Sequence, residues 1–297
     1  SNYDITLRRC RAYNNGKYGF ACKGSGGYRL DRCAAWGNDS SQMYCRGFDG
    51  GSGLPRPPAL NDLVLTNCVF IAPPDQRGGG ALNWRENVHL SVYHSTVVGL
   101  RNEGYGQAGG YSFELGHPHA FPVLGVLRNS IVVGYTDSPA LRFSMNNGVA
   151  YLTNTRYEAG HNLFFSDAST KFRYQSQNWR SLSNWQAYWS LGEANGDDAL
   201  RGPRATQADS NSVFASPEFL GVSPLMVPLR RQWSAALLDS QNHCDVRVGA
   251  NSAAVGLGEN LGGLGMAELL VDYEGRPRPA VGAWTAGAFV ETGTSSP

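Results

Sequence analysis

The chain has 297 residues and a formal net charge of +1 at pH 7. This near balance of charge gives no reason to expect a nucleic-acid partner, so any anionic partner has to be argued from local charge. No apolar run approaches the roughly 18–20 residues that a membrane-spanning helix needs. We therefore expect neither nucleic acid nor a membrane as a partner.

Residues 3–49 contain one pattern twice. The first copy holds Cys10 and Cys22, and the second holds Cys33 and Cys45. Both pairs of equivalent cysteines are 23 residues apart. A fixed period of this size is the sequence signature of a solenoid, in which each coil packs on its neighbours. We therefore expect positions 23 residues apart to lie side by side in space.

The pattern continues in three later segments, residues 62–71, 88–98 and 124–133, after a loop rich in Gly and Pro. The segments are short, rich in β-branched residues and bounded by Asn, Gly and Asp, which is typical of strands. Nothing between them resembles a crossover helix, so an α/β sheet is disfavoured. Alignment predicts one column of Cys10, Cys33, Cys68, His94 and Ser130, with His94 bonded in the core. It predicts a preceding column of Arg9, Arg32, Asn67, Tyr93 and Asn129.

The six cysteines leave two interpretations open. No C-x-x-C pair is present, so a structural zinc site is not expected. Stacked strands lie about 4.8 Å apart, which a disulfide accepts. Side-by-side cysteines on parallel strands often point the same way, however, and a buried free thiol behaves as a small hydrophobe. We favour a buried ladder of thiols over disulfides, and the cysteines alone do not identify the compartment.

The C-terminal part of the chain has a different texture. Residues 181–191 predict one short helix, with Trp185 and Trp189 at positions i and i+4 and Ser183 as the N-cap. We divide the chain into coils at 1–165 and C-terminal coils with a capping region at 166–297, continuous with the solenoid, because an open end exposes unpaired backbone. The first coil starts in mid-pattern, so we expect an N-terminal portion of a longer protein, or another chain, to cover it.

The coils resemble those of the right-handed parallel β-helix proteins, the pectate-lyase-like solenoids, which carry a hydrophobic–x–hydrophobic–x–Asn–Cys/small pattern. The tail is similar to that of many secreted bacterial members, whose Asp-x-x-Gly-x-x-Arg-Pro stretch is filled here by residues 272–279. In the flanking stretches, Gly256, Thr285 and Val290 replace the family's acidic residues. The resemblance implies an all-β fold, a right-handed parallel β-helix solenoid with a short helix and a loop-rich C-terminal cap. It also implies a secreted or cell-surface location.

The positions that follow the second cysteine column predict a charged groove. Alternate residues of a strand face opposite sides, so Lys23 and Arg46 point outward if Cys22 and Cys45 point inward. Stacked cations repel one another, and an anionic ligand relieves that repulsion. We interpret the column as a groove for an acidic polysaccharide; the other interpretation is a solvated face with long side chains in water. The predicted column is Lys23, Arg46, Arg85, Glu114 and Ser144, flanked by Tyr18, Tyr44 and Tyr105.

The resemblance implies the chemistry of a polysaccharide lyase. A base removes the proton next to a uronate carboxylate, and cations or Ca²⁺ held by acids stabilise the charge that forms. The base in such enzymes is often Lys or Arg, which makes Lys17, Lys23 and Arg46 candidates. His117, in a His-Pro-His segment, is a candidate general acid/base or half of a metal site, against a plain surface role. Ca²⁺ is a cofactor of some such lyases, but no Ca²⁺ motif is established here.

We therefore expect a carbohydrate-active protein, in first place a polysaccharide lyase that acts by β-elimination on an acidic, uronate-containing polysaccharide. A non-catalytic glycan-binding or assembly solenoid is the alternative, which the replaced acidic residues of the tail favour. A glycoside hydrolase is less favoured, because it needs two carboxylates across one sugar bond and the spacing pairs none. The acids considered are Asp39, Asp49, Asp75, Glu103 and Glu114.

Overall fold

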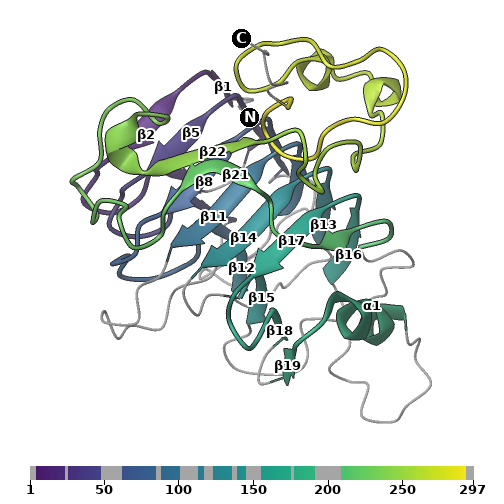
Figure 1. The fold of residues 1–297 in the computed structure, drawn as a ribbon, viewed down its shortest axis with the longest axis horizontal. Coiled ribbons are helices and arrows are strands. Elements are labelled where there is room, and N and C mark those ends of the chain that lie inside the picture. Colours follow the sequence, from purple (N-terminus) through teal and green to yellow (C-terminus); the bar gives the residue numbers. More distant parts are fainter. Residues whose placement is uncertain are drawn as a thin grey trace.

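The computed structural model describes residues 5–23, 26–47, 62–84, 88–100, 113–116, 123–135, 139–144, 155–174, 177–190 and 209–291. These residues are mostly β structure in parallel sheets, with one short α-helix, α1 (Leu182–Ser190) (Figure 1). The prediction of a mainly β chain with a short helix is thus confirmed for the described part of the chain.

Successive strands enter three sheets in rotation, so that each strand from β4 to β18, and also β20, pairs with the strand three places before it. The exceptions are β19, which pairs with β18, and the last two strands, which pair with each other. The first sheet contains β1 (Ile5–Arg8), β4 (Tyr28–Asp31), β7 (Asp62–Thr66), β10 (His89–Tyr93), β13 (Val123–Arg128) and β16 (Thr155–Gly160). The second contains β2 (Arg11–Tyr13), β5 (Ala34–Trp36), β8 (Val69–Ala72), β11 (Thr96–Leu100), β14 (Ile131–Tyr135), β17 (Leu163–Ser166) and β20 (Val213–Phe214). The third contains β3 (Phe20–Lys23), β6 (Met43–Arg46), β9 (Leu82–Trp84), β12 (Phe113–Gly116), β15 (Leu141–Ser144), β18 (Phe172–Tyr174) and β19 (Gln177–Trp179). We call three successive strands, one from each sheet, a rung.

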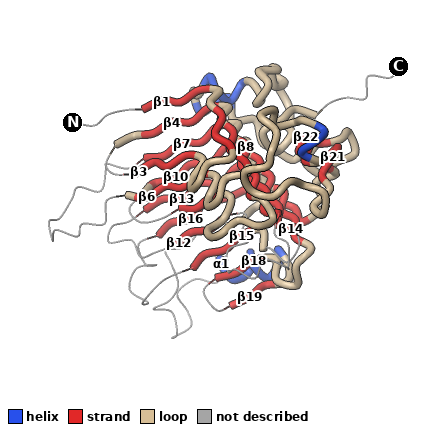
Figure 2. The backbone as a smooth tube through the Cα atoms, turned by 90° about the vertical axis from the view of Figure 1, so that its left-hand side faces the viewer, coloured by secondary structure: helices blue, strands red, loops and turns tan. Residues whose placement is uncertain are grey.

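The register of the first two rungs follows the 23-residue period. Leu7 pairs with Leu30 in the first sheet, and Cys22 pairs with Cys45 in the third. The pairs are parallel, and Figure 2 shows the strands of the first sheet stacked side by side. The prediction that positions 23 residues apart become neighbours is confirmed.

A single residue in the left-handed region makes the corner between the first and second sheets in each rung. This conformation is uncommon outside glycine, and Asn is among the residues that adopt it most readily. His94 occupies this corner in the fourth rung, so it belongs with Asn67 and Asn129, and Ser95 takes the place predicted for it. The predicted columns were therefore wrong by one residue there. The corner residues are Arg9 (φ 54°), Arg32 (52°), Asn67 (53°), His94 (46°), Asn129 (53°) and His161 (56°).

The inner faces of the three sheets pack into one hydrophobic core. Each sheet contributes a row of apolar residues, for example Leu65 from the first, Phe70 from the second and Trp84 from the third, all at 0% exposure. Trp84 also donates its indole N–H to the carbonyl oxygen of Val88 at 2.8 Å, so its one polar group is satisfied. Burial of large side chains of this kind supplies most of the stability of such a core.

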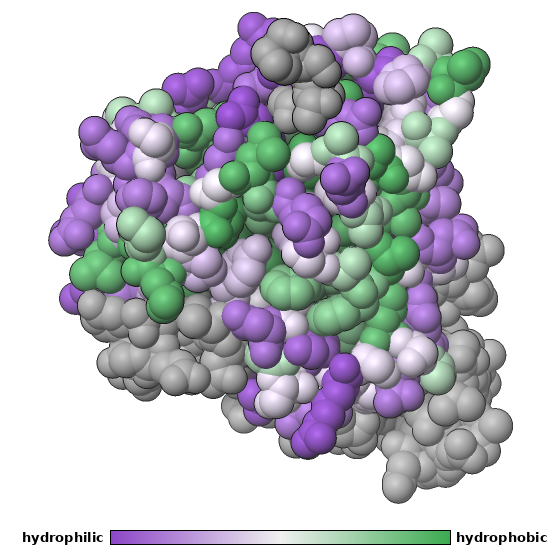
Figure 3. Space-filling view, viewed as in Figure 1, coloured by the Kyte–Doolittle hydropathy of each residue, from purple (hydrophilic) through white to green (hydrophobic). Residues whose placement is uncertain are grey.

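A second core lies on the outer face of the second sheet. Trp36, Ile71 and Val98 point away from the first core and pack against residues 219–291, which we call the C-terminal segment. Trp233 and Phe289 of this segment belong to the second core. This segment contains the antiparallel pair β21 (Phe219–Val222) and β22 (Cys244–Val248), which Figure 1 shows lying over β8 and β11. It also contains 3₁₀ turns at Ser240–Asn242, Gly262–Leu264 and Ala267–Leu270. Figure 3 looks onto this side, where hydrophobic and hydrophilic residues are interleaved.

Helix α1 packs against the last rung. Trp185 is fully buried and its ring stacks on Phe172 with centroids 5.3 Å apart. The predicted helix is confirmed, but its N-terminal cap is Ser181, whose hydroxyl accepts the N–H of Asn184, and not Ser183. Within the described residues, no helix is long and apolar enough to cross a membrane.

The first rung is less buried than the rung that follows it. Leu7 and Phe20 are only partly buried, whereas their partners Leu30 and Met43 are at most 1% exposed. The predicted cover over this rung, by an N-terminal portion or another chain, stays a prediction. So does the division of the chain at residue 165, which falls inside β17.

All six cysteines are free thiols. Cys10, Cys33 and Cys68 follow one another in consecutive rungs, and the hydrogen bond from the Cys33 thiol to the Leu7 carbonyl shows how close these rungs lie. Burial raises the pKa of Cys22 and of Cys33 to about 12 each. The structure thus agrees with the favoured interpretation, a buried ladder of thiols.

We expect iodoacetamide at pH 8 to leave the five buried cysteines of the folded protein unmodified and to react only with the partly exposed Cys10. A rise in thiol pKa from 9 to about 12 lowers the reactive thiolate fraction by about three orders of magnitude, and burial blocks access as well. Peptide mapping by mass spectrometry measures this, with guanidinium-unfolded protein as the control in which all six react. Fast labelling of Cys33 or Cys68 in the native state would contradict it.

Candidate functional site

The outer face of the third sheet carries the cationic residues predicted to line a groove. Cys22 and Cys45 point into the core at 7% and 0% exposure, so the residues after them point outward. Lys23 and Arg46 are direct partners in the register of β3 and β6. Lys23 is exposed and Arg46 is partly buried. The predicted neighbourhood of these two cations is therefore present.

Two lysines and two tyrosines form a compact group beside this pair, which we call the lysine–tyrosine cluster: Lys17, Tyr18, Lys23 and Tyr44. The Tyr18 and Tyr44 rings stack with centroids 4.4 Å apart. The Lys23 Nζ lies 5.3 Å from the Tyr18 centroid and 5.2 Å from the Tyr44 centroid, and the Lys17 Nζ lies 5.2 Å from that of Tyr18. Each such cation–π contact is worth about 0.5–1 kcal/mol at an exposed site. The tyrosines thus hold both ammonium groups at the surface of one sheet.

The turn between the second and third sheets is what brings Lys17 and Tyr18 to this place. The Asn38 side chain, fully buried, accepts hydrogen bonds from the backbone N–H and the side chain of Asn15 at 2.9 Å each. The Lys17 carbonyl accepts the N–H of Ser40 at 2.7 Å, so the turns of successive rungs are tied together. The next residue but one is Gly19, whose backbone lies very close to the next rung. A Cβ atom at this position would lie 2.4 Å from the Gln42 carbonyl oxygen, so only glycine fits here.

Glu114 does not lie in the column of Lys23 and Arg46, and that prediction was wrong. The prediction aligned Phe113 with Trp84, whereas the structure pairs Leu115 with Trp84. Glu114 is therefore the partner of Asn83, whereas the prediction placed it two residues later along the strand, beside Arg85. A shift of two residues keeps every side chain on its predicted face, so the alternation of apolar residues did not reveal the error.

Two arginines on the same face were missed from the sequence. Arg142 is the direct partner of Glu114, and Arg173 is the direct partner of Arg142. Each stands between two apolar residues of a short strand, in Leu-Arg-Phe and Phe-Arg-Tyr. That alternation is the signal that marks them as outward-facing. The third sheet thus carries cations on its first strands, β3 and β6, and again on its later strands, β15 and β18.

Three predicted site residues, Arg85, Tyr105 and His117, lie outside the described residues, so their roles stay predictions. Among the described residues, no three His, Cys, Asp or Glu side chains converge as a group that could hold a metal ion. The site as described is therefore made of cations and aromatic rings.

Two of the acids considered for a hydrolase, Asp39 and Asp75, are engaged elsewhere. Asp39 and Asp75 are both 6% exposed and face the C-terminal segment. Arg230 lies between them, with its Nη1 3.1 Å from Asp75 and its Nε 3.4 Å from Asp39. Arg231 adds a contact of 2.6 Å to Asp39. These carboxylates bind cations of the same chain and do not face a groove; Asp49 and Glu103 lie outside the described residues.

The tail signature has a structural role in this protein. The Asp272 carboxylate accepts the backbone N–H of Arg276 at 2.8 Å and that of Val290 at 3.0 Å, and Gly275 has φ 87° in the turn between. Arg278, 6% exposed, donates to the side chain of Asn67 at 3.1 Å. The signature therefore fastens the C-terminal segment to a corner of the third rung.

His94 is a core histidine, as predicted. It is fully buried, and its Nε2 lies 2.9 Å from the side-chain nitrogen of Asn129 in the next rung. Burial, followed by the charge of Arg278, lowers the pKa of His94 well below its usual range. A neutral imidazole at this corner belongs to the packing and not to the candidate site.

Comparison with protein-family models, with curated proteins and with solved structures finds no match to this chain. The function is therefore argued from the residues and their geometry alone.

Proposed function

We propose that this chain is a right-handed parallel β-helix that binds an acidic polysaccharide across the outer face of its third sheet. The rotation of strands through three parallel sheets supports the β-helix. The lysine–tyrosine cluster, with Arg46 beside it, is the observation that carries the binding function. Two ammonium groups and a guanidinium group suit the carboxylates of a polyuronate, and the partly exposed Tyr18 ring, which stacks on the buried Tyr44, suits the face of a sugar.

The proposed reaction is β-elimination, which makes the protein a secreted or cell-surface polysaccharide lyase. A base takes the proton from the carbon next to the uronate carboxylate, a C=C bond forms, and the glycosidic C–O bond at the β carbon breaks. The leaving oxygen takes up a proton and becomes a new chain end. Lys17, which contacts only the Tyr18 ring among the described residues, is the candidate base, whereas Lys23 and Arg46 face the carboxylate and neutralise its developing charge.

The test is ultraviolet detection of the unsaturated product over a panel of polyuronates, combined with binding measurements. We expect the variant Lys17→Gln with Lys23→Gln to bind the polymer roughly tenfold more weakly at low salt, because two cations are lost from one surface. Arg180→Gln is the matched control, since Arg180 is an exposed cation in the turn before α1. Equal binding by both variants would remove the proposal.

A non-catalytic glycan-binding module is the second candidate, and one observation favours it. Glu114 is the one acidic residue in the described strands of the third sheet, and its direct partners are Asn83 and Arg142. It is therefore not placed to assist Lys23 in proton transfer. Tight binding of a polyuronate without any unsaturated product would select this candidate over the lyase.

A further inference from the structure

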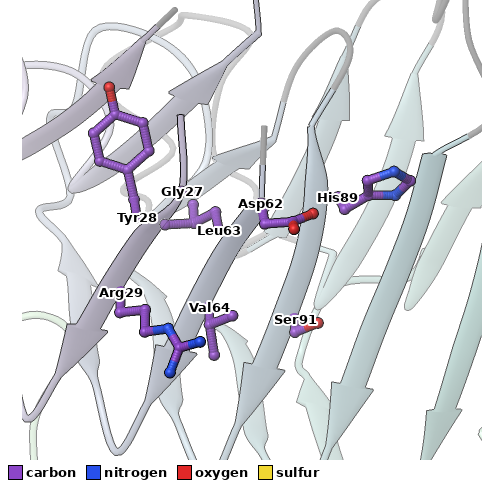
Figure 4. Close-up of a pocket in the computed structure, with 8 residues that line it drawn as sticks. All are labelled: Gly27, Tyr28, Arg29, Asp62, Leu63, Val64, His89 and Ser91. Atoms are coloured by element: carbon purple, nitrogen blue, oxygen red, sulfur yellow. The ribbon is translucent and has the colours of Figure 1, made fainter. Parts of the chain in front are cut away.

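The first sheet carries a separate groove on its outer face, with a volume of about 440 Å³. It is lined by polar groups from three neighbouring strands, β4, β7 and β10, as Figure 4 shows. Arg29 and Asp62 are exposed, while His89, Ser91 and Val64 are partly buried. The size falls in the range of pockets that bind small molecules. The lysine–tyrosine cluster lies on a different sheet, so this groove is not part of the site described above.

The register fixes where the polar groups stand. Asp62 and His89 are direct partners, and Figure 4 shows the Asp62 carboxylate pointing toward the His89 strand. Arg29 is the direct partner of Val64, and Ser91 is the partner of Val64 on the other side. Strand geometry therefore puts Asp62 and Arg29 diagonally across the groove, with Cα atoms roughly 8 Å apart. One end of the groove is anionic and the other is cationic.

Three of these groups are available to a ligand. Within the described residues, the side chains of Arg29, Asp62 and Ser91 make no hydrogen bond and no ion pair, although the charge of Arg29 is one of the smaller causes that lower the pKa of Glu268. The neighbouring Arg8 is different, because it is held by Glu268 at 2.8 Å. Tyr28 forms part of the wall, and its hydroxyl donates to the Lys23 carbonyl at 2.8 Å, which fixes the ring at the edge.

We propose that this groove is a binding site for a single uronic-acid sugar. A guanidinium group binds a carboxylate through two parallel hydrogen bonds, which assigns the sugar carboxylate to Arg29. Asp62 accepts hydrogen bonds from ring hydroxyls at the other end, and Ser91 lies between as donor or acceptor. A dicarboxylate fits less well, because its second charge would face Asp62. This inference rests on the proposed function in one respect: the uronic-acid sugar comes from the same class of polymer that the third sheet is proposed to bind.

The test is a titration of the full chain with D-galacturonate, followed by NMR at the backbone amides of Val64 and Ser91. We expect saturable shifts at these amides, and D-galactose, which lacks the carboxylate, to bind roughly tenfold more weakly or worse. Arg29→Gln should remove this preference for the acidic sugar, and Arg29→Lys should retain part of it. Arg180→Gln, an equal loss of charge elsewhere, should bind as the wild type does.

The outcomes separate this site from the one on the third sheet. Lys17→Gln with Lys23→Gln should leave the Val64 and Ser91 shifts unchanged, so failure of the polymer-binding proposal does not remove this one. Equal affinity for galacturonate and galactose, or wild-type binding by Arg29→Gln, would overturn it. A preference for glycine over galacturonate would also overturn it, since an amino acid could place its ammonium group on Asp62.

Discussion

Replacing Arg230 by methionine is expected to lower the free energy of unfolding by about 3 kcal/mol, because it leaves two buried carboxylates with fewer partners. Arg230 lies between Asp39 and Asp75, whose side chains are 8% and 6% exposed. Its Nη1 also donates to the Asp75 carbonyl at 2.7 Å. Loss of one partner from a buried ion pair costs about 3–5 kcal/mol, and the lower value applies because the backbone N–H of residue 230 still donates to Asp75.

Urea unfolding measures this effect, and Arg231→Met is the matched control. Arg231 donates to the same Asp39 at 2.6 Å, but its side chain is 54% exposed, so water can replace it at the carboxylate and its loss should cost less than that of Arg230, about 1–2 kcal/mol. Adding Asp75→Asn to Arg230→Met should recover part of the stability, because it removes the charge left without its partner. Equal costs for the two arginine variants would show that the carboxylates are not effectively buried.

Arg230 illustrates a contact that no sequence pattern reveals. It meets Asp75 across a separation of 155 residues, and no period links the two segments. The second core was missed for a different reason, although a signal was present. The second-sheet strands Val69–Ala72 and Ile131–Tyr135 are apolar at consecutive positions, and such runs are typical of strands buried on both faces. The C-terminal segment is the cover that this signal predicts.

The rungs themselves could be predicted as far as the period was constant. Cys22 and Cys45, or Lys23 and Arg46, were paired correctly because the first two rungs have equal length. Later rungs differ in length, so the register had to be chosen from alternation alone. A shift of two residues is invisible to alternation, which explains the error at Glu114. The error of one residue at His94 has another cause. His94 is the left-handed corner residue that follows β10, and the prediction did not allow for such a corner.

The candidate site was predictable to a similar extent. The pairing of Lys23 with Arg46 follows from the period, and the presence of Tyr44 on the outward side follows from strand alternation. The contact of Lys17 and Tyr18 with these residues depends on the shape of the turn that Asn38 and Gly19 set. That shape comes from side-chain hydrogen bonds between rungs, which a single-sequence pattern does not encode.

The buried carboxyl group of Asp209 is expected to make the protein less stable as the pH rises from about 4 to about 7. Asp209 is fully buried, and its carboxylate accepts the Trp185 indole N–H at 2.8 Å and the Tyr157 hydroxyl at 3.3 Å. Burial is the largest cause that raises the pKa of Asp209 to about 7, against an ordinary value of 3.8, while the hydrogen bonds lower it. The residue fastens α1 to the last rungs.

The direction of the effect follows from proton binding. Between the two pKa values the folded state holds a proton on Asp209 that the unfolded state has released, so rising pH favours unfolding. One pH unit across this window costs up to 1.36 kcal/mol, and the whole window costs up to about 4 kcal/mol. Below about pH 4 the carboxyl group is neutral in both states and the penalty is absent.

Asp209→Asn isolates this contribution, because an amide keeps an oxygen for the Trp185 N–H and carries no charge at any pH. We expect the variant to match the wild type near pH 4 and to exceed its stability by up to about 4 kcal/mol at pH 8. Urea unfolding at a series of pH values measures the difference, with Asp62→Asn at an exposed position as the control. A constant difference between Asp209→Asn and wild type at every pH would mean that Asp209 is ionised in the folded protein throughout, with its buried charge balanced by the Trp185 and Tyr157 donors.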